Sequence, residues 1–427
     1  MSTDTAAPSL ALRREDFGAV GYQHDTRRLV FLRRPDEAGR PLAELVAGGL
    51  RAPVCLTWEL TYACNLQCVH CLSSSGRPDP RELDTDGCRA LIDEMAAMGV
   101  FYVNIGGGEP TLRPDFWELL EYAVQRRVGV KFSTNGIRIT PQRARWLAAA
   151  PDIDVQVSLD GATAPVNDAI RGAGSYATAL SALTRLRAAG FVDPKLSVVC
   201  TRETVAHLDE LLALADDHGA TLRLTRLRPS GRGAQVWDGL RLLPGQQRLV
   251  YDWLRIHGHR VLTGDSFFHL SGYGDPLPGL SGCGAGRVVC LVDPIGDVYA
   301  CPFAIHDRFR AGNVTTDGGL AQVWRSAPAF AALRDASAGP ECRGCAAYQD
   351  CRGGCPAAKF FTGLAPEAPD PECVQGRAAQ RLAASQDRPT HGIDHSRRTS
   401  LAVLADSPCD QSPLQGFLPE LFPPDPS

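Results

Sequence analysis

Residues 58–71 read WELTYACNLQCVHC, an apolar run that leads directly into three cysteines within eight positions. Cys64, Cys68 and Cys71 have the spacing C-x3-C-x2-C, and the stretch holds no fourth cysteine. A structural zinc site favours four ligands, usually in paired C-x2-C arms. A disulfide framework favours an even number of cysteines in a short secreted chain. The spacing therefore indicates a metal centre that keeps one position open for chemistry.

The composition of the chain limits the classes of protein to which it can belong. It has 427 residues, 44% of them hydrophobic, and a net charge of −4, as is usual for a soluble protein of two or three domains. Nothing in this balance suggests nucleic acid or an anionic membrane as a partner, no apolar run could span a bilayer, and no signal peptide is evident. We therefore expect a cytoplasmic protein, in which disulfides are rare. Fifteen cysteines in that compartment indicate metal ligation first.

Short apolar runs alternate with stretches of helical period six times between residues 51 and 265, beginning with VCLTWEL and TDGCRALIDEMAAM. Regular alternation of this kind predicts a parallel sheet covered by helices. Six units are fewer than the eight of a closed barrel, so we expect an α/β fold with a partial, open (β/α)6 barrel. The chemistry of such folds lies at the C-terminal ends of the strands, which is where the three cysteines follow the first strand.

The flanking regions have other patterns. Residues 1–50 predict a flexible lead and a β-hairpin at 18–33. Residues 266–385 are rich in Gly, Cys and Pro, which predicts a small domain held together by metal rather than by a large apolar core. Residues 386–427 are polar and rich in proline, and we expect a disordered tail there.

The three cysteines after the first strand resemble those of the radical S-adenosylmethionine (SAM) superfamily. The resemblance implies a [4Fe–4S] cluster held by Cys64, Cys68 and Cys71, whose fourth iron chelates SAM through its amino and carboxylate groups. Reductive cleavage of SAM would then yield a 5′-deoxyadenosyl radical that abstracts hydrogen from an unactivated C–H bond.

Further motifs at strand ends extend this resemblance to a SAM site. GGE at 107–109 resembles the motif that receives the methionyl amine, because glycines allow close backbone approach and a carboxylate pairs with an ammonium. STNG at 133–136 and SLDG at 158–161 stand where family members contact the ribose and the methionyl carboxylate. The resemblance assigns to SAM Gly107, Gly108, Glu109, Ser133, Asn135, Ser158, Arg171 (a carboxylate partner), Leu224 (on the strand where adenine packs) and His70, which could stack on adenine. Ser133, Asn135, Ser158 and Arg171 could instead be turn or cap residues.

Eight cysteines between residues 283 and 373 resemble those of the SPASM domain, an extension of radical SAM enzymes that carries auxiliary [4Fe–4S] clusters. The chain matches the family's pattern, which is C-x9–15-G-x4-C, then C-x2-C-x5-C-x3-C and a last cysteine. Cys290 is an additional thiolate. Following the family's interleaved ligation, the first auxiliary cluster would take Cys283, Cys290, Cys301 and Cys355, and the second Cys342, Cys345, Cys351 and Cys373. Zinc is the alternative for such spacings. The resemblance implies three clusters in all, and we assign no function to Cys55, Cys88, Cys200 and Cys409.

Longer stretches, among them VFYVNIGGGEPTLRPDFWELL and CGAGRVVCLVDPIGDVYACPFAIHD, resemble the mycofactocin radical SAM maturases over about residues 50–376. That family acts on a small ribosomal precursor peptide ending in Val-Tyr. The resemblance implies oxidative decarboxylation of the C-terminal tyrosine, then carbon–carbon bond formation between the valine and the tyrosine-derived unit. Two auxiliary clusters could accept the electron released in the first step, and a flavodoxin-type or ferredoxin-type protein would donate electrons.

Two stretches could hold the peptide. LRLTRLRPSGRG, at the end of the sixth strand, contains Arg223, Arg226, Arg228 and Arg232, one of which could pair with the peptide carboxylate or with SAM. Surface solvation is the alternative for each. GDSFFHL at 264–270 could line the cavity or only pack. Residues 1–50 are too short for the winged-helix recognition domain of many peptide-modifying members, so recognition of the leader should fall to a separate small chaperone.

The sequence also allows two other functions. Another SPASM-type maturase could form thioether crosslinks or formylglycine, although formylglycine-forming enzymes usually carry an acid where Pro302 and Phe303 follow Cys301 here. A redox sensor or electron carrier would perform no radical chemistry. The GGE motif argues against that function, because a carrier has no need to chelate SAM.

Overall fold

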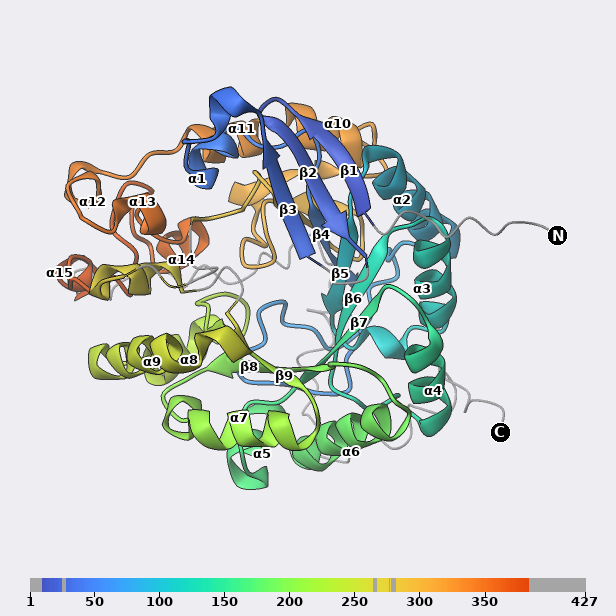
Figure 1. Ribbon diagram of the computed structural model, residues 1–427. Helices are drawn as coiled ribbons and strands as arrows, with labels where there is room; N and C mark the ends of the chain where they lie inside the picture. Colours follow the sequence, from blue (N-terminus) through green and yellow to red (C-terminus); the bar gives the residue numbers. More distant parts are fainter. Residues whose placement is uncertain (1–9, 25–27, 264–266, 276, 278–281, 384–427) are drawn as a thin grey trace, which may run out of the picture.

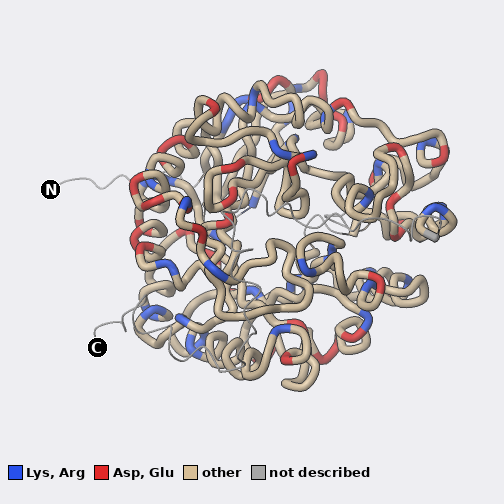
Figure 2. Tube along the Cα trace, turned by 180° about the vertical axis from the view of Figure 1, so that it is seen from behind, with Lys and Arg blue, Asp and Glu red and all other residues tan. Residues whose placement is uncertain are grey.

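Figure 1 shows a computed structural model of the protein, which describes residues 10–24, 28–263, 267–275, 277 and 282–383. The predicted tail at 386–427 and residues 264–266 of GDSFFHL lie outside the described residues. Helices surround a large central sheet, and a small sheet lies against one end of it. Figure 2 shows acidic and basic residues interspersed over the opposite side of the molecule. None of the described helices is both long and apolar enough to cross a membrane.

The predicted partial barrel is confirmed. Six parallel strands lie side by side in chain order, and a short seventh strand, β10 (Val261–Leu262), pairs with the last of them. The six strands are β4 (Cys55–Thr61), β5 (Tyr102–Gly107), β6 (Gly129–Thr134), β7 (Ile153–Ser158), β8 (Lys195–Cys200) and β9 (Thr221–Arg226). The helices after them are α2 (Thr85–Met98), α3 (Phe116–Gln125), α4 (Pro141–Ala149), α5 (Ala164–Arg171), α6 (Ser175–Ala188), α7 (Leu208–Asp217), α8 (Gly233–Leu240) and α9 (Pro244–His257).

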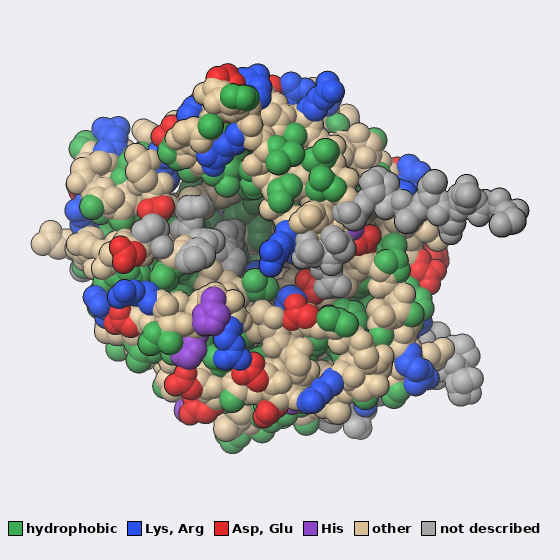
Figure 3. Space-filling view, viewed as in Figure 1, with side chains coloured by type: hydrophobic (Ala, Val, Ile, Leu, Met, Phe, Trp, Pro, Cys, Tyr) green, Lys and Arg blue, Asp and Glu red, His purple; other side chains and the backbone are tan. Residues whose placement is uncertain are grey.

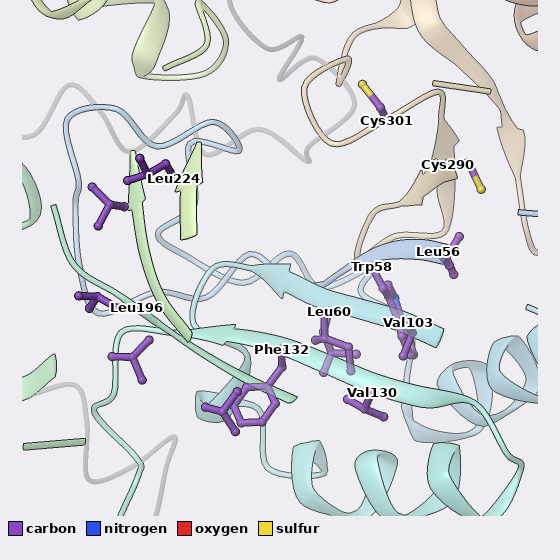
Figure 4. Packing of buried hydrophobic residues seen from close by; sticks show 14 of the residues in the cluster. Leu56, Trp58, Leu60, Val103, Val130, Phe132, Leu196, Leu224, Cys290 and Cys301 are labelled. Carbon is purple, nitrogen blue, oxygen red and sulfur yellow. The ribbon is translucent and has the colours of Figure 1, made fainter. Parts of the chain in front are cut away.

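Alternation along the strands separates an apolar face from a polar one, because successive side chains of a strand point to opposite faces. Leu56, Trp58 and Leu60 of β4 are each at most 1% exposed and belong to the main hydrophobic cluster, which Figure 4 shows together with Phe132 of β6. The intervening positions of the strands are often polar, such as Lys131. The apolar face packs against the helices, and the polar residues lie on the opposite face of the same strands.

The cysteine-rich region begins as an extension of the barrel sheet. Strand β11 (Val289–Val292) pairs in parallel with β4, and β12 (Asp297–Tyr299) and β13 (Arg310–Asn313) continue the sheet in antiparallel fashion. The sequence predicted a small separate domain and gave no sign of this pairing. Six short helices follow: α10 (Gly319–Ser326), α11 (Pro328–Asp335), α12 (Pro340–Arg343), α13 (Tyr348–Cys351), α14 (Pro356–Phe361) and α15 (Ala379–Ala383).

The N-terminal residues form a three-stranded antiparallel sheet. Strands β2 (Gly18–Gln23) and β3 (Arg28–Arg33) pair over the range of the predicted hairpin, but β1 (Leu10–Glu15) adds a third strand where a flexible lead was expected. Helix α1 (Leu42–Leu45) follows. Tyr22 stacks on Phe101, which directly precedes β5, with ring centroids 6.1 Å apart. The small sheet therefore lies where the barrel strands begin, at the end opposite to the cysteine loop.

Candidate functional site

The loop after β4 brings its three cysteines together beside Glu109. Burial, together with the neighbouring charges of Glu109, Cys68 and Cys71, raises the pKa of the Cys64 thiol to about 12. These groups come from the ends of β4 and β5, which are adjacent and parallel. The C-x3-C-x2-C motif and the GGE motif thus meet at the end of the barrel where chemistry is expected.

Close backbone contacts explain the two glycines of GGE. Gly107 has a φ of +105°, which side chains rarely permit. A Cβ on Gly108 would lie 2.0 Å from the carbonyl oxygen of Ala63, the residue before the first cysteine. The cysteine loop and the GGE turn are therefore in direct backbone contact, and only glycine allows it.

Glu109 connects the ends of two neighbouring strands and is only 1% exposed. Its Oε1 accepts hydrogen bonds from the Thr111 hydroxyl at 2.5 Å and the Thr134 hydroxyl at 2.8 Å, and its Oε2 accepts one from the Asn135 backbone at 2.7 Å. Burial raises the pKa of Glu109, while these hydrogen bonds oppose the rise. The Asn135 amide in turn donates to Asn65 of the cysteine loop at 2.9 Å. GGE, STNG and the cysteine loop therefore form one hydrogen-bonded unit.

His70 and Arg171 meet on a buried carboxylate, Asp160 of the SLDG motif. The Oδ2 of Asp160 lies 2.6 Å from His70 Nε2 and 2.6 Å from Arg171 Nε, and its Oδ1 accepts from the Val199 backbone at 2.7 Å. Asp160 is fully buried; although burial raises its pKa, the charges of Arg171 and His70 hold that pKa well below its usual range. Sequence reasoning assigned His70 and Arg171 to SAM but gave Asp160 no role. SLDG contained the signal, because it ends a strand with a carboxylate.

The remaining predicted SAM residues lie on neighbouring strands. Ser133 and Ser158 are half-buried near the ends of β6 and β7. Leu224 is fully buried in the main hydrophobic cluster, and it alternates along β9 with Arg223 and Thr225 on the other face. The structure therefore groups Ser133 and Ser158 with the strand ends, but it packs the Leu224 side chain among apolar residues (Figure 4).

Arg232, in the segment after β9, holds the cysteine loop in place. Its backbone N–H and its Nε donate to the carbonyls of Cys71 and Cys68, each at 2.9 Å, and its Nη1 donates to the carbonyl of Ser75 at 2.9 Å. A Cβ on the preceding Gly231 would approach the Cys71 carbonyl to 2.4 Å. Arg232, considered from the sequence as a contact to SAM, to the peptide or to solvent, instead donates its hydrogen bonds to the loop.

Arg226 joins the barrel to the C-terminal region. Its Nη2 donates to Asp370 at 2.5 Å, its Nε donates to Glu372, and all three side chains are nearly inaccessible to solvent. Asp370 also accepts from the Cys355 backbone at 2.8 Å. Surface solvation, the alternative for this arginine, is therefore wrong. The Arg228 guanidinium lies over the Phe303 ring at 4.6 Å, again between barrel and C-terminal region.

The cysteines expected to bind the second auxiliary cluster line one small pocket, together with His269 and Asp370. Burial, together with the charges of Asp370 and Cys373, raises the pKa of the Cys351 thiol to about 12. His269, buried in the 310 helix Phe268–Tyr273, has a pKa well below its usual value because of burial and the nearby Arg226 charge. The four cysteines in this pocket are Cys342, Cys345, Cys351 and Cys373.

The cysteines expected to bind the first auxiliary cluster are arranged differently. Cys283 lines a cavity of about 1100 Å³ together with Gly354 and Pro356, the neighbours of Cys355. This cavity lies between the N-terminal sheet and the C-terminal region and opens as a recess with hydrophobic walls in Figure 3. Cys290 is fully buried in β11, and in Figure 4 its thiol points away from that of Cys301.

Among the described residues, no three His, Cys, Asp or Glu side chains stand close enough to share a single metal ion. In a [4Fe–4S] cluster each thiolate binds a different iron atom, so cluster ligands need not converge on one point. The three cysteines of the loop after β4 and the four-cysteine pocket therefore fit cluster chemistry.

Comparison with known proteins identifies the family. The Radical SAM superfamily pattern matches residues 58–215, and the iron-sulfur cluster-binding domain SPASM matches residues 283–346. Mycofactocin maturase MftC of Mycobacterium ulcerans is 64% identical over 358 residues, which cover 83% of this chain and 97% of that protein. The maturase of the same name from Mycolicibacterium smegmatis is 60% identical over 383 residues, 87% and 98% of the two chains.

This chain belongs to the mycofactocin maturase family. Solved structures share the maturase fold. Streptococcus suis SuiB bound to S-adenosylmethionine superposes with a TM-score of 0.68 at 16% identity, covering 87% of this chain and all of that one. Native anSMEcpe with bound AdoMet gives a TM-score of 0.58 at 18% identity, covering 77% and 98%. At these identities the likeness concerns the fold alone.

The N-terminal segment of the maturase has its own relative. Residues 5–46 match the Peptide chaperone MftB family, a range that includes β1 to β3 and α1. Sequence reasoning missed this likeness, because it considered only whether a complete winged-helix domain would fit in residues 1–50. The third strand, β1, was the element that the sequence pattern did not reveal.

Proposed function

We propose that this maturase catalyses oxidative decarboxylation of the C-terminal tyrosine of a small ribosomal precursor peptide ending in Val-Tyr, followed by carbon–carbon bond formation between the valine and the tyrosine-derived unit. The observation that carries the proposal is the identity of 60% with a mycofactocin maturase over 87% of this chain. This identity favours the proposed reaction over the alternatives, a thioether-forming or formylglycine-forming maturase or an electron carrier.

SAM and the cluster of Cys64, Cys68 and Cys71 supply a 5′-deoxyadenosyl radical when they are bound. The part of this chain is to orient SAM. Among the described residues, Oε2 of Glu109 accepts only the Asn135 N–H. A carboxylate oxygen has two lone pairs, so Oε2 can accept a further hydrogen bond from the methionyl ammonium.

Arg171 would hold the methionyl carboxylate. Its Nε faces Asp160 at 2.6 Å, and a guanidinium has further N–H donors on its two η nitrogens. Asp160 would thus fix the direction of Arg171 while the η nitrogens bind the carboxylate. His70, on the other side of Asp160, would fix the cysteine loop against the same group. Gly107, Gly108, Ser133, Asn135 and Ser158 complete the proposed SAM site, whereas the Leu224 side chain packs in the hydrophobic cluster on the other face of its strand.

The proposal includes a radical SAM core at 51–265, which holds one [4Fe–4S] cluster. Two auxiliary [4Fe–4S] clusters would lie in the region 266–385 that follows it, which makes three clusters in total. The pocket of Cys342, Cys345, Cys351 and Cys373 supports the second of them. Decarboxylation of tyrosine releases one electron more than the radical takes up, so an acceptor near the substrate is needed. A separate chaperone, a flavodoxin-type or ferredoxin-type donor and a cytoplasmic location complete the proposal.

The likeness of residues 5–46 to a peptide chaperone family supports a peptide partner. SuiB, a solved structure of the same fold, has been crystallised bound to precursor peptide SuiA. For this maturase the peptide would enter at the C-terminal ends of the strands, where the cysteine loop lies.

The test uses the anaerobically loaded enzyme with reductant, SAM, chaperone and a precursor ending in Val-Tyr, followed by mass spectrometry of the peptide. A loss equal to one carbon dioxide and two hydrogen atoms supports the proposal. An unchanged peptide accompanied by 5′-deoxyadenosine would rule out this substrate but keep the radical chemistry. If well-loaded clusters yield no 5′-deoxyadenosine, the maturase assignment itself fails.

A further inference from the structure

Lys359 is a buried lysine of the cysteine-rich region, on helix α14. The helix begins directly after Cys355, and the backbone N–H of Lys359 donates to the Cys355 carbonyl at 3.0 Å. Lys359 is only 4% exposed, so its side chain is largely removed from water. Placing a charged group in the interior costs free energy unless a group of opposite charge compensates it.

The described residues supply no ion pair for this ammonium group. The Nζ of Lys359 donates a hydrogen bond at 3.0 Å to the carbonyl of Pro366, which is a neutral group, and no described carboxylate pairs with it. Another buried cation of this part of the molecule is different, because Asp370 and Glu372 both accept from the guanidinium of Arg226. Lys359 therefore lacks the counter-charge that Arg226 has.

The Lys359 ammonium lies beside the four-cysteine pocket. Gly353 forms part of the wall of that pocket, and a Cβ on Gly353 would lie 3.5 Å from the Lys359 Nζ. Burial raises the pKa of the Cys342 thiol, and among the neighbouring charges that of Lys359 opposes this rise most. The contact with the wall and the effect on the thiol thus place the positive charge next to the predicted ligands of the second auxiliary cluster.

A [4Fe–4S] cluster bound by four thiolates would supply the missing counter-charge. The thiolates outweigh the positive charge of the core, so the bound cluster is an anion, and its reduced form carries one more negative charge than its oxidised form. A nearby cation therefore stabilises the reduced form more than the oxidised form. Because net charge is one of the factors that set the potential of such a cluster, this cation should raise the reduction potential.

We propose that the Lys359 ammonium is the counter-charge of the cluster in the four-cysteine pocket and raises the reduction potential of that cluster. The inference rests on the proposed function, which includes this cluster and needs an electron acceptor. After a hydrogen atom has been abstracted from the tyrosine unit, the carbon radical loses carbon dioxide, a carbon–carbon double bond forms, and one electron is released. An oxidised auxiliary cluster takes up this electron and becomes reduced, and a raised potential makes it a better acceptor.

The first experiment measures reduction potentials. Full-length parent, Lys359→Met, Lys359→Gln and Lys359→Arg are loaded anaerobically, their iron content is determined, and electron paramagnetic resonance spectra are recorded during a potentiometric titration. Methionine and glutamine both remove the charge, glutamine keeps an N–H donor, and arginine keeps the charge. We expect one midpoint to fall in both neutral variants, so that the ratio of reduced to oxidised cluster at the parental midpoint decreases at least tenfold, equivalent to about 59 mV. Unchanged midpoints in the neutral variants, or an equal fall in Lys359→Arg, would overturn the proposal.

Arg343→Met is the matched control. Arg343 follows the predicted ligand Cys342 directly in the chain, but it is exposed, so solvent and salt screen its charge. Its replacement should leave every midpoint near the parental value. A fall as large as that of Lys359→Met would contradict a specific role for the buried ammonium.

The second experiment assigns the shifted midpoint to a cluster. Cys345→Ala/Cys351→Ala removes two of the four thiolates predicted for the second auxiliary cluster and none of those predicted for the other clusters. Adding Lys359→Met to this double variant should shift none of the remaining midpoints. A shift that persists would place the effect of the charge at another cluster and refute the assignment.

These outcomes are separable from a failure of the proposed function. The titrations contain no precursor peptide, so they report on the charge beside the cluster in any reaction that the enzyme performs. An unchanged peptide mass, together with a lowered midpoint in Lys359→Met, would reject only the assigned reaction. The expected mass change together with equal midpoints would reject only the role of Lys359.

Discussion

Arg226 of strand β9 and Asp370 of the C-terminal region form a buried ion pair, with Nη2 and Oδ1 2.5 Å apart, although 144 residues separate them in the chain. Glu372 is a second carboxylate that accepts from the same guanidinium. Since Asp370 also accepts the backbone N–H of Cys355 and lines the pocket of the four cysteines, this pair connects the last barrel strand to Cys355 and to that pocket.

Removing one partner of this ion pair should be strongly destabilising. Arg226→Met leaves Asp370 and Glu372 buried without a cation, and breaking a buried pair in this way typically costs about 3–5 kcal/mol. Thermal unfolding of the loaded enzyme should show a clearly lowered midpoint. Arg248→Met, which breaks an exposed ion pair with Asp252 on α9, is the control and should leave the midpoint unchanged. Equal midpoints for the two variants would contradict the role of Arg226.

Asp160→Asn should impair SAM binding while sparing the auxiliary clusters. The amide keeps the shape but loses the charge that orients Arg171 and His70. We expect the SAM-dependent change in the spectrum of the reduced enzyme to require at least tenfold more SAM, equivalent to about 1.4 kcal/mol. Iron content should stay near that of the parent. Unaltered SAM affinity would show that Asp160 does not position the SAM site.

Arg232→Met should loosen the loop of Cys64, Cys68 and Cys71. Two side-chain hydrogen bonds to loop carbonyls disappear, each worth about 1 kcal/mol. We expect this cluster to be reconstituted more slowly and to be lost faster on exposure to oxygen. Both rates are measured from the visible absorption of the cluster. Arg255→Met, at an exposed position on α9, is the matched control and should behave as the parent. If the cluster is equally durable in both variants, the loop does not depend on Arg232.

The barrel and the cysteine sites could be predicted because their signals are local in the sequence. Alternation along β4 and the spacing of Cys64, Cys68 and Cys71 depend only on neighbouring residues. SLDG showed that a carboxylate ends a strand, but the pairing of Asp160 with His70 could not be predicted, because the two residues lie 90 positions apart. The pairing of β11 with β4 is likewise a tertiary contact between distant segments. Strand β1 was not predicted for another reason. Its sequence, LALRRE, contains too little strict alternation of apolar and polar residues to distinguish a strand from a flexible lead.

Asp293 should make stability depend on pH in the opposite direction to most carboxylates. It accepts a hydrogen bond from Tyr62 at 2.7 Å, and burial together with the charge of Asp297 raises its pKa to about 7. In the unfolded chain an aspartate has a pKa of about 3.9. The folded state therefore holds this proton more tightly, so the stabilisation is complete below about pH 4 and is lost as the pH rises through about 7.

The test compares the parent with Asp293→Asn, which cannot titrate, between pH 5.5 and 8.5. The difference in unfolding free energy, parent minus variant, should fall with rising pH by up to about 1.4 kcal/mol per unit and level off above about pH 7. Asp252→Asn, at an exposed carboxylate on α9, should give a difference without this slope. A parent-minus-Asp293→Asn difference that stays constant between pH 5.5 and 8.5 would mean that Asp293 is already ionised in the folded protein over this range, with the buried Tyr62 hydroxyl donating to a charged carboxylate.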